Sequence, residues 1–296
     1  MSSLAIIATV KAPIEQLKFF INYHLNVGAD QIILFFDDPN DKDIEQIQHY
    51  ELVTVIPCTT EYWEKSTSQR PNSIEKRQVT NVNKGIQIAL DKKCNWIAHI
   101  DSDELLNPKQ DIKEVLKYCK ADAIRFELLE AAPEREYYKN IYEPTLFKKK
   151  PTTLQIRMAK LLGCRRSIYN NEYLRGHLKS KMAIKLNSKI RKFGIHGPID
   201  FDDSITIIDT KKIQLLHYDC VGIENWKLKW SRRLDGSATA EKMRGNRNEQ
   251  FMAYTRAAKI GNTELSKVYQ KIHTIPVYEK IVLFALGMLT RVTIKV

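Results

Sequence analysis

The chain has few of the features that mark small secreted or zinc-stabilised proteins. Its 296 residues contain five cysteines, a scattered odd set with no Cys-x-x-Cys pair: Cys58, Cys94, Cys119, Cys164 and Cys220. This usage argues against a zinc ribbon and a disulfide framework, and it favours a reducing compartment. The first ten residues lack the basic start of a secretory leader. A cytoplasmic protein is therefore expected.

Glycine-rich phosphate loops are also absent. Neither Gly-x-x-x-x-Gly-Lys nor Gly-x-Gly-x-x-Gly occurs, which counts against enzymes built on such loops. No apolar run approaches the roughly twenty residues that span a bilayer. The apolar stretch at residues 281–289 has basic flanks. It predicts either a final helix packed on the domain or an interfacial helix, which would place the protein peripherally at the inner face of the cytoplasmic membrane.

Positive charge is in excess and unevenly spread. The sequence has 47 Lys and Arg against 35 Asp and Glu, a net charge of +12. Fourteen basic and five acidic residues lie from Asn225 onward, a balance of +9. Such a region suits nucleic acid, anionic lipid or a phosphorylated substrate, and it also suits a plain solvated helical face. No nucleic-acid-binding motif accompanies the charge, so no nucleic-acid partner is expected.

Apolar runs and helical periodicity alternate in the first hundred residues. Strands are predicted at residues 4–10, 31–36, 52–56 and 95–100, and helices at 13–26 and 72–90. The alternation predicts an α/β fold with a mixed, mainly parallel sheet flanked by helices. Weaker patterns predict strands at 123–129, 181–186 and 204–216, a basic loop at 148–151, and helices after residue 224. We predict a main domain over residues 1–235 and a basic helical extension over 236–296.

The segment Asp101-Ser102-Asp103-Glu104 directly follows the apolar run at residues 96–100. The carboxyl edge of an open α/β sheet is where ligands bind. Carboxylates gathered there repel one another unless a cation lies among them, and Mg²⁺ and Mn²⁺ prefer oxygen ligands. The segment therefore predicts a metal–diphosphate site. The alternative is an acidic turn that caps a helix beginning at Glu104.

Four segments in this order resemble the family 2-type glycosyltransferases with a GT-A fold, in particular a bacterial branch with an Asp-x-Asp-Glu block. They are Thr9-Val10-Lys11, Arg77-Gln78 with Asn81, the block at residues 96–104, and His217-Tyr218 followed by a helix with Trp226 and Arg232-Arg233. The similarity covers roughly residues 4–235. Family members often carry Asn-Glu where this chain has Ala12-Pro13. The acid of that loop is thus missing or replaced by Glu15.

The resemblance implies a nucleotide-sugar donor, UDP-linked, and a divalent cation, Mn²⁺ or Mg²⁺. Asp103 would ligate the metal, and Asp101 would reach the metal, its water or the ribose. His217 is the first candidate for a further ligand and His196 the second. An imidazole ligand would favour Mn²⁺. The residues expected at the nucleotide are Val10, Lys11, Asp37, Asp38, Arg77, Gln78, Asn81, Asp101 and Ser102.

The resemblance also implies transfer of a hexose, with inversion, to a glycan or lipid-linked glycan such as lipopolysaccharide or capsule. Inversion needs a carboxylate to deprotonate the acceptor hydroxyl. Glu127, Glu130 and Asp200 are the candidates, and the choice among them stays open. A second hypothesis is a nucleotidyltransferase or phosphotransferase that uses the same acidic metal site.

Overall fold

The computed structural model describes residues 2–168, 172–176, 178–186, 189–190, 192–199, 204–236, 243 and 245–294. The chain forms two compact units. Unit 1 comprises Met1–Glu127, Lys179–Leu215 and the single residue Val296; unit 2 comprises Leu128–Leu178 and Leu216–Lys295. The division predicted at residue 235 does not coincide with a boundary of these units.

Unit 1 contains a mixed sheet in the order β6-β8-β4-β1-β2-β3, and β5 pairs with β9. The strands are β1 (Leu4–Val10), β2 (Gln31–Phe36), β3 (Val53–Pro57), β4 (Trp96–His99), β5 (Glu104–Pro108), β6 (Ala123–Ala131), β8 (Met182–Lys185) and β9 (Ile207–His217). Strands β4, β1, β2 and β3 are mutually parallel. β8 runs antiparallel to both β4 and β6. The predicted mixed sheet with flanking helices is confirmed.

Five helices of unit 1 connect or flank these strands: α1 (Ile14–Asn26), α2 (Ile44–Ile47), α3 (Thr60–Thr67), α4 (Ile74–Asp91) and α5 (Ile112–Lys117). Side chains cap three of them, because each first turn leaves backbone N–H groups without an intrahelical partner. Thr59 caps α3, Ser73 caps α4 and Asp111 caps α5. These caps fix the residues at which α3, α4 and α5 begin.

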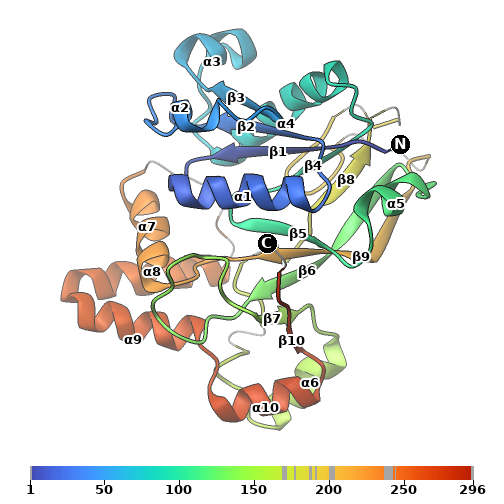
Figure 1. The fold of residues 1–296 in the computed structure, drawn as a ribbon. Coiled ribbons are helices and arrows are strands. Elements are labelled where there is room, and N and C mark those ends of the chain that lie inside the picture. The colour runs from blue at the N-terminus through green and yellow to red at the C-terminus, as the bar shows by residue number, and fades with distance from the viewer. Residues whose placement is uncertain are drawn as a thin grey trace. The chain divides into compact units, whose positions relative to one another are not determined.

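The core of unit 1 lies between the sheet and α4. Ala5 and Ile7, alternate residues of β1, share a buried cluster with Val82 and Ala89 of α4. A Cβ at Gly85 would lie 2.8 Å from Cδ1 of Ile7, so glycine lets α4 approach β1 this closely. Figure 1 draws α1 below β1 in this view. Every residue of β1 is buried, as the continuous apolar run predicted.

Unit 2 combines a small antiparallel sheet with helices. Its strands are the end of β6, β7 (Leu146–Lys149) and β10 (Leu289–Arg291), in the order β10-β7-β6. Its helices are α6 (Thr153–Leu161), α7 (Ile223–Leu234), α8 (Gly245–Ile260), α9 (Asn262–His273) and α10 (Val277–Ala285). The basic loop predicted at 148–151 is wrong in part, because Lys148 lies within β7 and is 3% exposed.

Aromatic side chains form the core of the helical part of unit 2. Trp226 of α7 makes edge-on contacts with the rings of Tyr254 (5.2 Å between centroids) and Tyr269 (5.6 Å). Gly261, with φ of 132°, is the single residue between α8 and α9. The predicted helical character of the region after residue 236 is thus confirmed over α8, α9 and α10, and β10 is an unpredicted strand. Within the described ranges, no helix is both long and apolar enough to cross a membrane.

Candidate functional site

The acidic segment forms a tight turn between β4 and β5 of unit 1. The backbone N–H of Glu104 donates to the carbonyl of Asp101 (2.9 Å), and the N–H of Asp101 donates to Oε2 of Glu104 (2.8 Å). Gln16 of α1 donates to the carbonyl of Ser102 (2.8 Å). Glu104 begins strand β5, so the alternative of a helix capped by these acids is wrong. The predicted position at the carboxyl end of β4 is confirmed.

A buried lysine that the sequence analysis did not predict contacts this turn. Nζ of Lys181 lies 2.9 Å from Oδ2 of Asp101 and 3.8 Å from Oε2 of Glu104, and the lysine side chain is fully buried. Burial alone would lower the pKa of Lys181, but the carboxylates of Asp101 and Glu104 outweigh it and raise that pKa. Lys181 is therefore a fixed positive charge beneath the acidic turn.

Gln78 and Asn81 of α4 have different roles in unit 1. Nε2 of Gln78 donates to Oδ1 of Asp101 (2.6 Å), so both oxygens of that carboxylate have protein partners. Asn81 is fully buried, donates to Oγ1 of Thr9 (2.9 Å) and accepts from the hydroxyl of Tyr62 (2.7 Å). Gln78 orients the acidic turn, while Asn81 ties α4 to β1. Their predicted contacts with a nucleotide stay predictions.

Asp37 and Arg77 form a buried ion pair at the carboxyl end of β2. Nε of Arg77 lies 2.7 Å from Oδ1 of Asp37, and Nη2 donates to Oδ2 (3.1 Å). Arg77 also donates to the carbonyls of Pro71 and Asn72. Arg70, which the sequence analysis missed, adds a third contact to Asp37 at 2.9 Å. The structure brings these residues together, and their contact with a nucleotide stays a prediction.

Lys11 and Asp38 form a second, more exposed pair next to the first. Nζ of Lys11 lies 3.3 Å from Oδ2 of Asp38, with side chains 43% and 41% exposed. The carbonyl of Val10, the last residue of β1, accepts from the N–H of Asp37 (3.0 Å) and so joins the ends of β1 and β2. The four predicted residues Val10, Lys11, Asp37 and Asp38 thus lie at one edge of the sheet.

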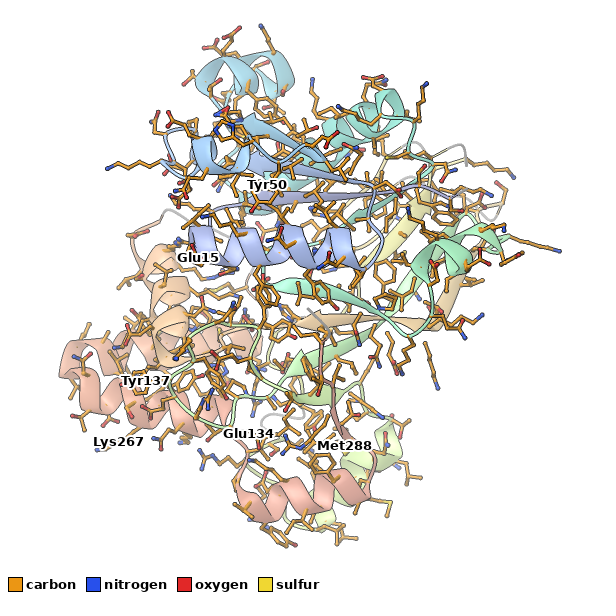
Figure 2. The ribbon with its side chains drawn as sticks, in the orientation of Figure 1. Glu15, Tyr50, Glu134, Tyr137, Lys267 and Met288 are labelled. Carbon is orange, nitrogen blue, oxygen red and sulfur yellow. The ribbon has the colours of Figure 1, made fainter. Side chains whose placement is uncertain are left out.

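Glu15 is an exposed residue of α1, and Figure 2 shows it at the start of that helix. Its side chain is 81% exposed and lies 3.7 Å from Nζ of Lys18. This pair is the ordinary i, i+3 contact of a helix surface. The structure thus offers no buried acid at this position to replace the Asn-Glu of the resembling family.

His99 and His196 belong to unit 1 and differ in setting. His99 is fully buried at the end of β4. Burial, together with the charge of Lys181, lowers the pKa of His99 to about 3, so its ring is neutral. His196 is half-buried. Its predicted role as a metal ligand stays a prediction.

His217 belongs to unit 2, at the end of β9, and lies beside Asp219. A ring nitrogen of His217 and a carboxylate oxygen of Asp219 lie within 4.8 Å of each other. Both residues are buried against Gly176, where a Cβ would lie 2.5 Å from Cε1 of His217 and 3.1 Å from Oδ2 of Asp219. Imidazole and carboxylate groups can both bind divalent metal ions, and the role of His217 as a metal ligand stays a prediction. Asp219 was not predicted.

Two cations hold the carboxylate of Asp219 in its charged form. Oδ2 lies 2.8 Å from Nη1 of Arg247, and Oδ1 bonds to Nζ of Lys229. Burial would raise the pKa of Asp219, but Arg247 and Lys229 outweigh it and hold that pKa well below its usual range. The carboxylate beside His217 is therefore ionised at neutral pH.

The three candidate bases have different settings. Glu127 is 24% exposed and accepts from Nε2 of Gln214 (2.8 Å). Glu130 is 2% exposed, pairs with Lys148 (3.1 Å), and accepts from the backbone N–H of Arg175 and its neighbour. Asp200 lies outside the described residues. No base is assigned by this geometry, and all three stay predictions.

Comparison with known proteins gives the class. The profile described as Glycosyltransferase family 92 matches residues 3–252, most of the chain. The predicted resemblance to glycosyltransferases is confirmed at the level of the family. The chain belongs to glycosyltransferase family 92. This membership favours sugar transfer over the second hypothesis of nucleotidyl or phosphoryl transfer.

Two curated relatives from Arabidopsis thaliana are similar to most of the chain. "Glycosyltransferase-like At2g41451" is 24% identical over 73% of this chain and 53% of its own length. "Glycosyltransferase-like At3g57200" is 24% identical over 73% of this chain and 46% of its own length. The chain therefore spans about half the length of these relatives. Among solved structures, S. aureus TarS 1-349 has a TM-score of 0.34 and 12% identity, covering 96% of this chain and 78% of that one.

Proposed function

We propose that the protein transfers a sugar from a UDP-sugar donor to a glycan acceptor with the help of a divalent cation. The supporting observation is the charge of the turn after β4. Three carboxylates surround one lysine there: Asp101, Asp103, Glu104 and Lys181. Their formal charge is −2, which suits a cation that in turn holds a diphosphate.

In this proposal Asp103 of the turn is the metal ligand in unit 1. His217, in unit 2, keeps its separate predicted role as a metal ligand. The carboxylate of Asp101 is held by Gln78 and Lys181. We therefore propose that Asp101 contacts the ribose or a metal-bound water. Direct binding of the metal by Asp101 is its alternative role. His196 remains the second candidate for the histidine ligand. A bound Mn²⁺ or Mg²⁺ would act as a Lewis acid that stabilises the leaving diphosphate.

The exposed pair of Lys11 and Asp38 is proposed to meet the nucleotide. Both side chains are accessible and lie beside the buried pair of Asp37 and Arg77, which fixes the surrounding backbone. An ammonium suits a phosphate and a carboxylate suits a ribose hydroxyl. We place the nucleoside at this edge of unit 1 for that reason.

Glu127 is our candidate for the base of an inverting reaction. Its carboxylate is partly exposed and held in place by Gln214, whereas the carboxylate of Glu130 is buried and bonded to three partners. A base must reach the proton that it removes. Glu127 meets that requirement better than Glu130, because its carboxylate is the more exposed of the two.

A membrane-linked acceptor remains part of the proposal. Helix α10 presents apolar side chains at helical spacing on its exposed side: Val277, Tyr278, Ile281 and Phe284. Such a face suits the interfacial alternative of the sequence analysis. A lipid-linked glycan, including a lipopolysaccharide or capsule precursor, fits an enzyme at the inner surface of the cytoplasmic membrane.

Thermal unfolding with a panel of nucleotide sugars tests this function. A ligand that binds only the folded state stabilises it by about 2.7 kcal/mol at one hundred times its Kd. We expect a rise in Tm with a UDP-sugar and Mn²⁺ that is lost in chelator and in Asp103→Asn. Asp91→Asn, an exposed change at the end of α4, should keep the full shift. A shift that persists in Asp103→Asn, or that needs no metal, would contradict the mechanism.

A further inference from the structure

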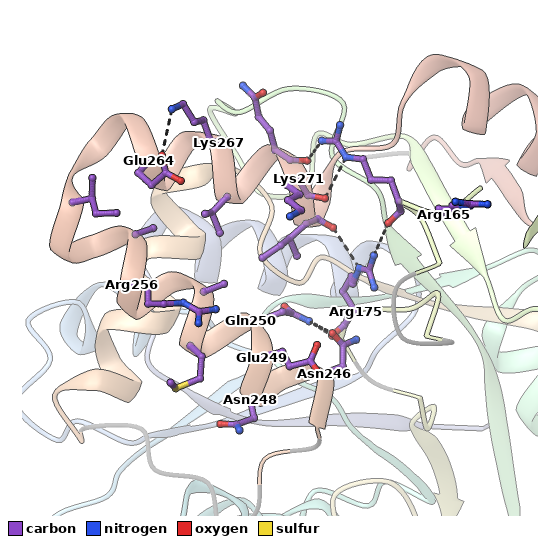
Figure 3. A pocket seen from close by; sticks show the side chains of 18 residues that line it. Arg165, Arg175, Asn246, Asn248, Glu249, Gln250, Arg256, Glu264, Lys267 and Lys271 are labelled. Carbon is purple, nitrogen blue, oxygen red and sulfur yellow. Dashed lines mark hydrogen bonds and ion pairs between the residues drawn. The ribbon is translucent and has the colours of Figure 1, made fainter. Parts of the chain in front are cut away.

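Unit 2 contains a concave pocket that the proposed reaction does not use. The cavity has a volume of about 990 Å³ and is lined by α8, α9 and the side chains of Arg165, Arg166 and Arg175. Figure 3 shows Arg256 on α8 and Lys271 on α9, and both side chains line this pocket. Cavities of this size hold small or extended ligands.

The lining is strongly basic. Six basic side chains face two acidic ones, a formal balance of +4. The basic residues are Arg165, Arg166, Arg175, Arg256, Lys267 and Lys271. A concave surface lined by one sign of charge concentrates ligands of the opposite sign.

Hydrogen bonds to backbone carbonyls hold two of the arginines that line the pocket, Arg166 and Arg175, in place. Nε of Arg166 donates to the carbonyl of Lys271 (3.3 Å), and Nη2 of Arg175 donates to the carbonyl of Arg166 (3.0 Å). Arg175 is 4% exposed and also donates to the carbonyl of Glu172 (3.2 Å). Carbonyl oxygens accept these bonds without neutralising the guanidinium charge, so the wall stays positive.

Three cations remain available at the rim. Arg165, Arg256 and Lys271 are exposed, and none of their side-chain nitrogens has a hydrogen-bond or ion-pair partner in the part of the chain that the structure describes. Lys267, by contrast, lies 3.3 Å from Glu264. Planar guanidinium groups suit carboxylate and phosphate by paired hydrogen bonds.

The pocket also exposes apolar surface. Met252 is 48% exposed and Ile260 is 74% exposed, and both line the cavity. The preferred ligand therefore carries anionic groups on a framework that also offers apolar faces. A sugar ring has such C–H faces, and a concave site fits a single chain better than a flat lipid surface.

We propose that this pocket binds the anionic part of the acceptor, a saccharide chain that carries carboxylate or phosphate groups; the proposal rests on the proposed function. The charged groups of the chain pair with Arg256, Lys271 and Arg165, while its ring faces lie on Met252 and Ile260. The pocket thus selects anionic glycans over neutral ones.

Fluorescence polarisation with two labelled probes tests the proposal. The probes are hexagalacturonate, which carries carboxylates, and phosphopentamannose, which carries phosphate; labelled maltohexaose is the neutral comparison. We expect at least one anionic probe to bind the full chain, to weaken on addition of salt, and to lose about tenfold in affinity in the double variant Arg256→Gln/Lys271→Gln. Binding by one anionic probe alone identifies which anionic group the pocket takes.

A matched double variant keeps the charge change and moves it away from the pocket. Arg157→Gln/Lys259→Gln also removes one arginine and one lysine, both exposed and neither lining the cavity. It should lose less than about twofold. Equal losses in both double variants, equal binding of maltohexaose, or binding only to vesicles with anionic phosphatidylglycerol would overturn the proposal.

The same assay separates this proposal from the proposed function. Asp103→Asn should bind the anionic probe as the unaltered chain does, because that aspartate lies in the turn after β4 and does not line the pocket. If the probe binds as expected but no nucleotide sugar shifts the Tm with metal, the donor proposal fails and the anion pocket stands. If the donor binds and the probe does not, the pocket proposal alone fails.

Discussion

Replacing Lys181 by methionine tests the charge arrangement of the acidic turn. Methionine replaces the apolar stem of the lysine and lacks only its terminal charged nitrogen. Glu104, 1% exposed, and Asp101, 19% exposed, are then left without their cation. Removing one partner of a buried ion pair costs about 3–5 kcal/mol. We expect the free energy of unfolding, measured in urea at pH 7, to fall by an amount in this range.

The pH dependence distinguishes a lost charge from lost packing. In the unaltered chain the pKa of Lys181 is raised, so its contribution is complete below its unfolded pKa of about 10.4 and is lost as pH rises through the higher folded value. Without the lysine, the buried carboxylate of Glu104 binds a proton more tightly when folded. The deficit of Lys181→Met should therefore shrink between pH 7 and pH 5. An equal deficit at both pH values, or one no larger than that of the exposed control Lys212→Met, would refute the reasoning.

A second change at Glu104 completes the test. In Lys181→Met/Glu104→Gln the buried carboxylate is removed together with its cation. Part of the lost stability should return, because the isolated charge is what costs most. A double variant less stable than the single one would show that the lysine acts mainly through packing.

Two further predictions follow from the geometry. Arg77→Lys loses the planar contacts to its buried aspartate; we expect about 2 kcal/mol lower stability in urea unfolding and weaker binding of the nucleotide sugar by titration calorimetry. Gly176→Ala places a Cβ 2.5 Å from His217; overpacking should lower stability by about 1–3 kcal/mol, and Mn²⁺ affinity, measured by electron paramagnetic resonance, should fall with it. A freely tolerated alanine would contradict the second prediction.

The strands buried on both faces were the most predictable part of the fold. The apolar runs gave the bounds of β1 and β2 correctly, because burial on both faces leaves no polar position to blur the limits. Helix α6 was missed, although Thr152 and Gln155 form a capping box that the sequence displays. The lysines at 148–150 predicted a solvated loop, yet Lys148 pairs with Glu130 inside unit 2. Charge alone does not reveal a partner eighteen residues away in the chain.

The candidate site was predictable only where its residues are close in sequence. The acidic turn follows from a strand end that the pattern located, whereas the pairing of Asp37 with Arg77, forty residues apart in the chain, was not predicted. Lys181 escaped notice because it precedes a short, ordinary strand and reaches Asp101 only through the pairing of β8 with β4. Asp219 has two cationic partners, and neither is adjacent in sequence. Tertiary contacts of this kind carry no local signal.

The pairing of β4 with β8 has a consequence for synthesis on the ribosome. Trp96, Ile97 and Ala98 find their antiparallel partners at Lys185, Ile184 and Ala183, more than eighty residues later in the chain. Until that partner has been translated, the apolar edge of β4 stays open to pairing with other nascent chains. Faster translation of this interval, or chaperone binding during it, should therefore improve the yield of folded protein.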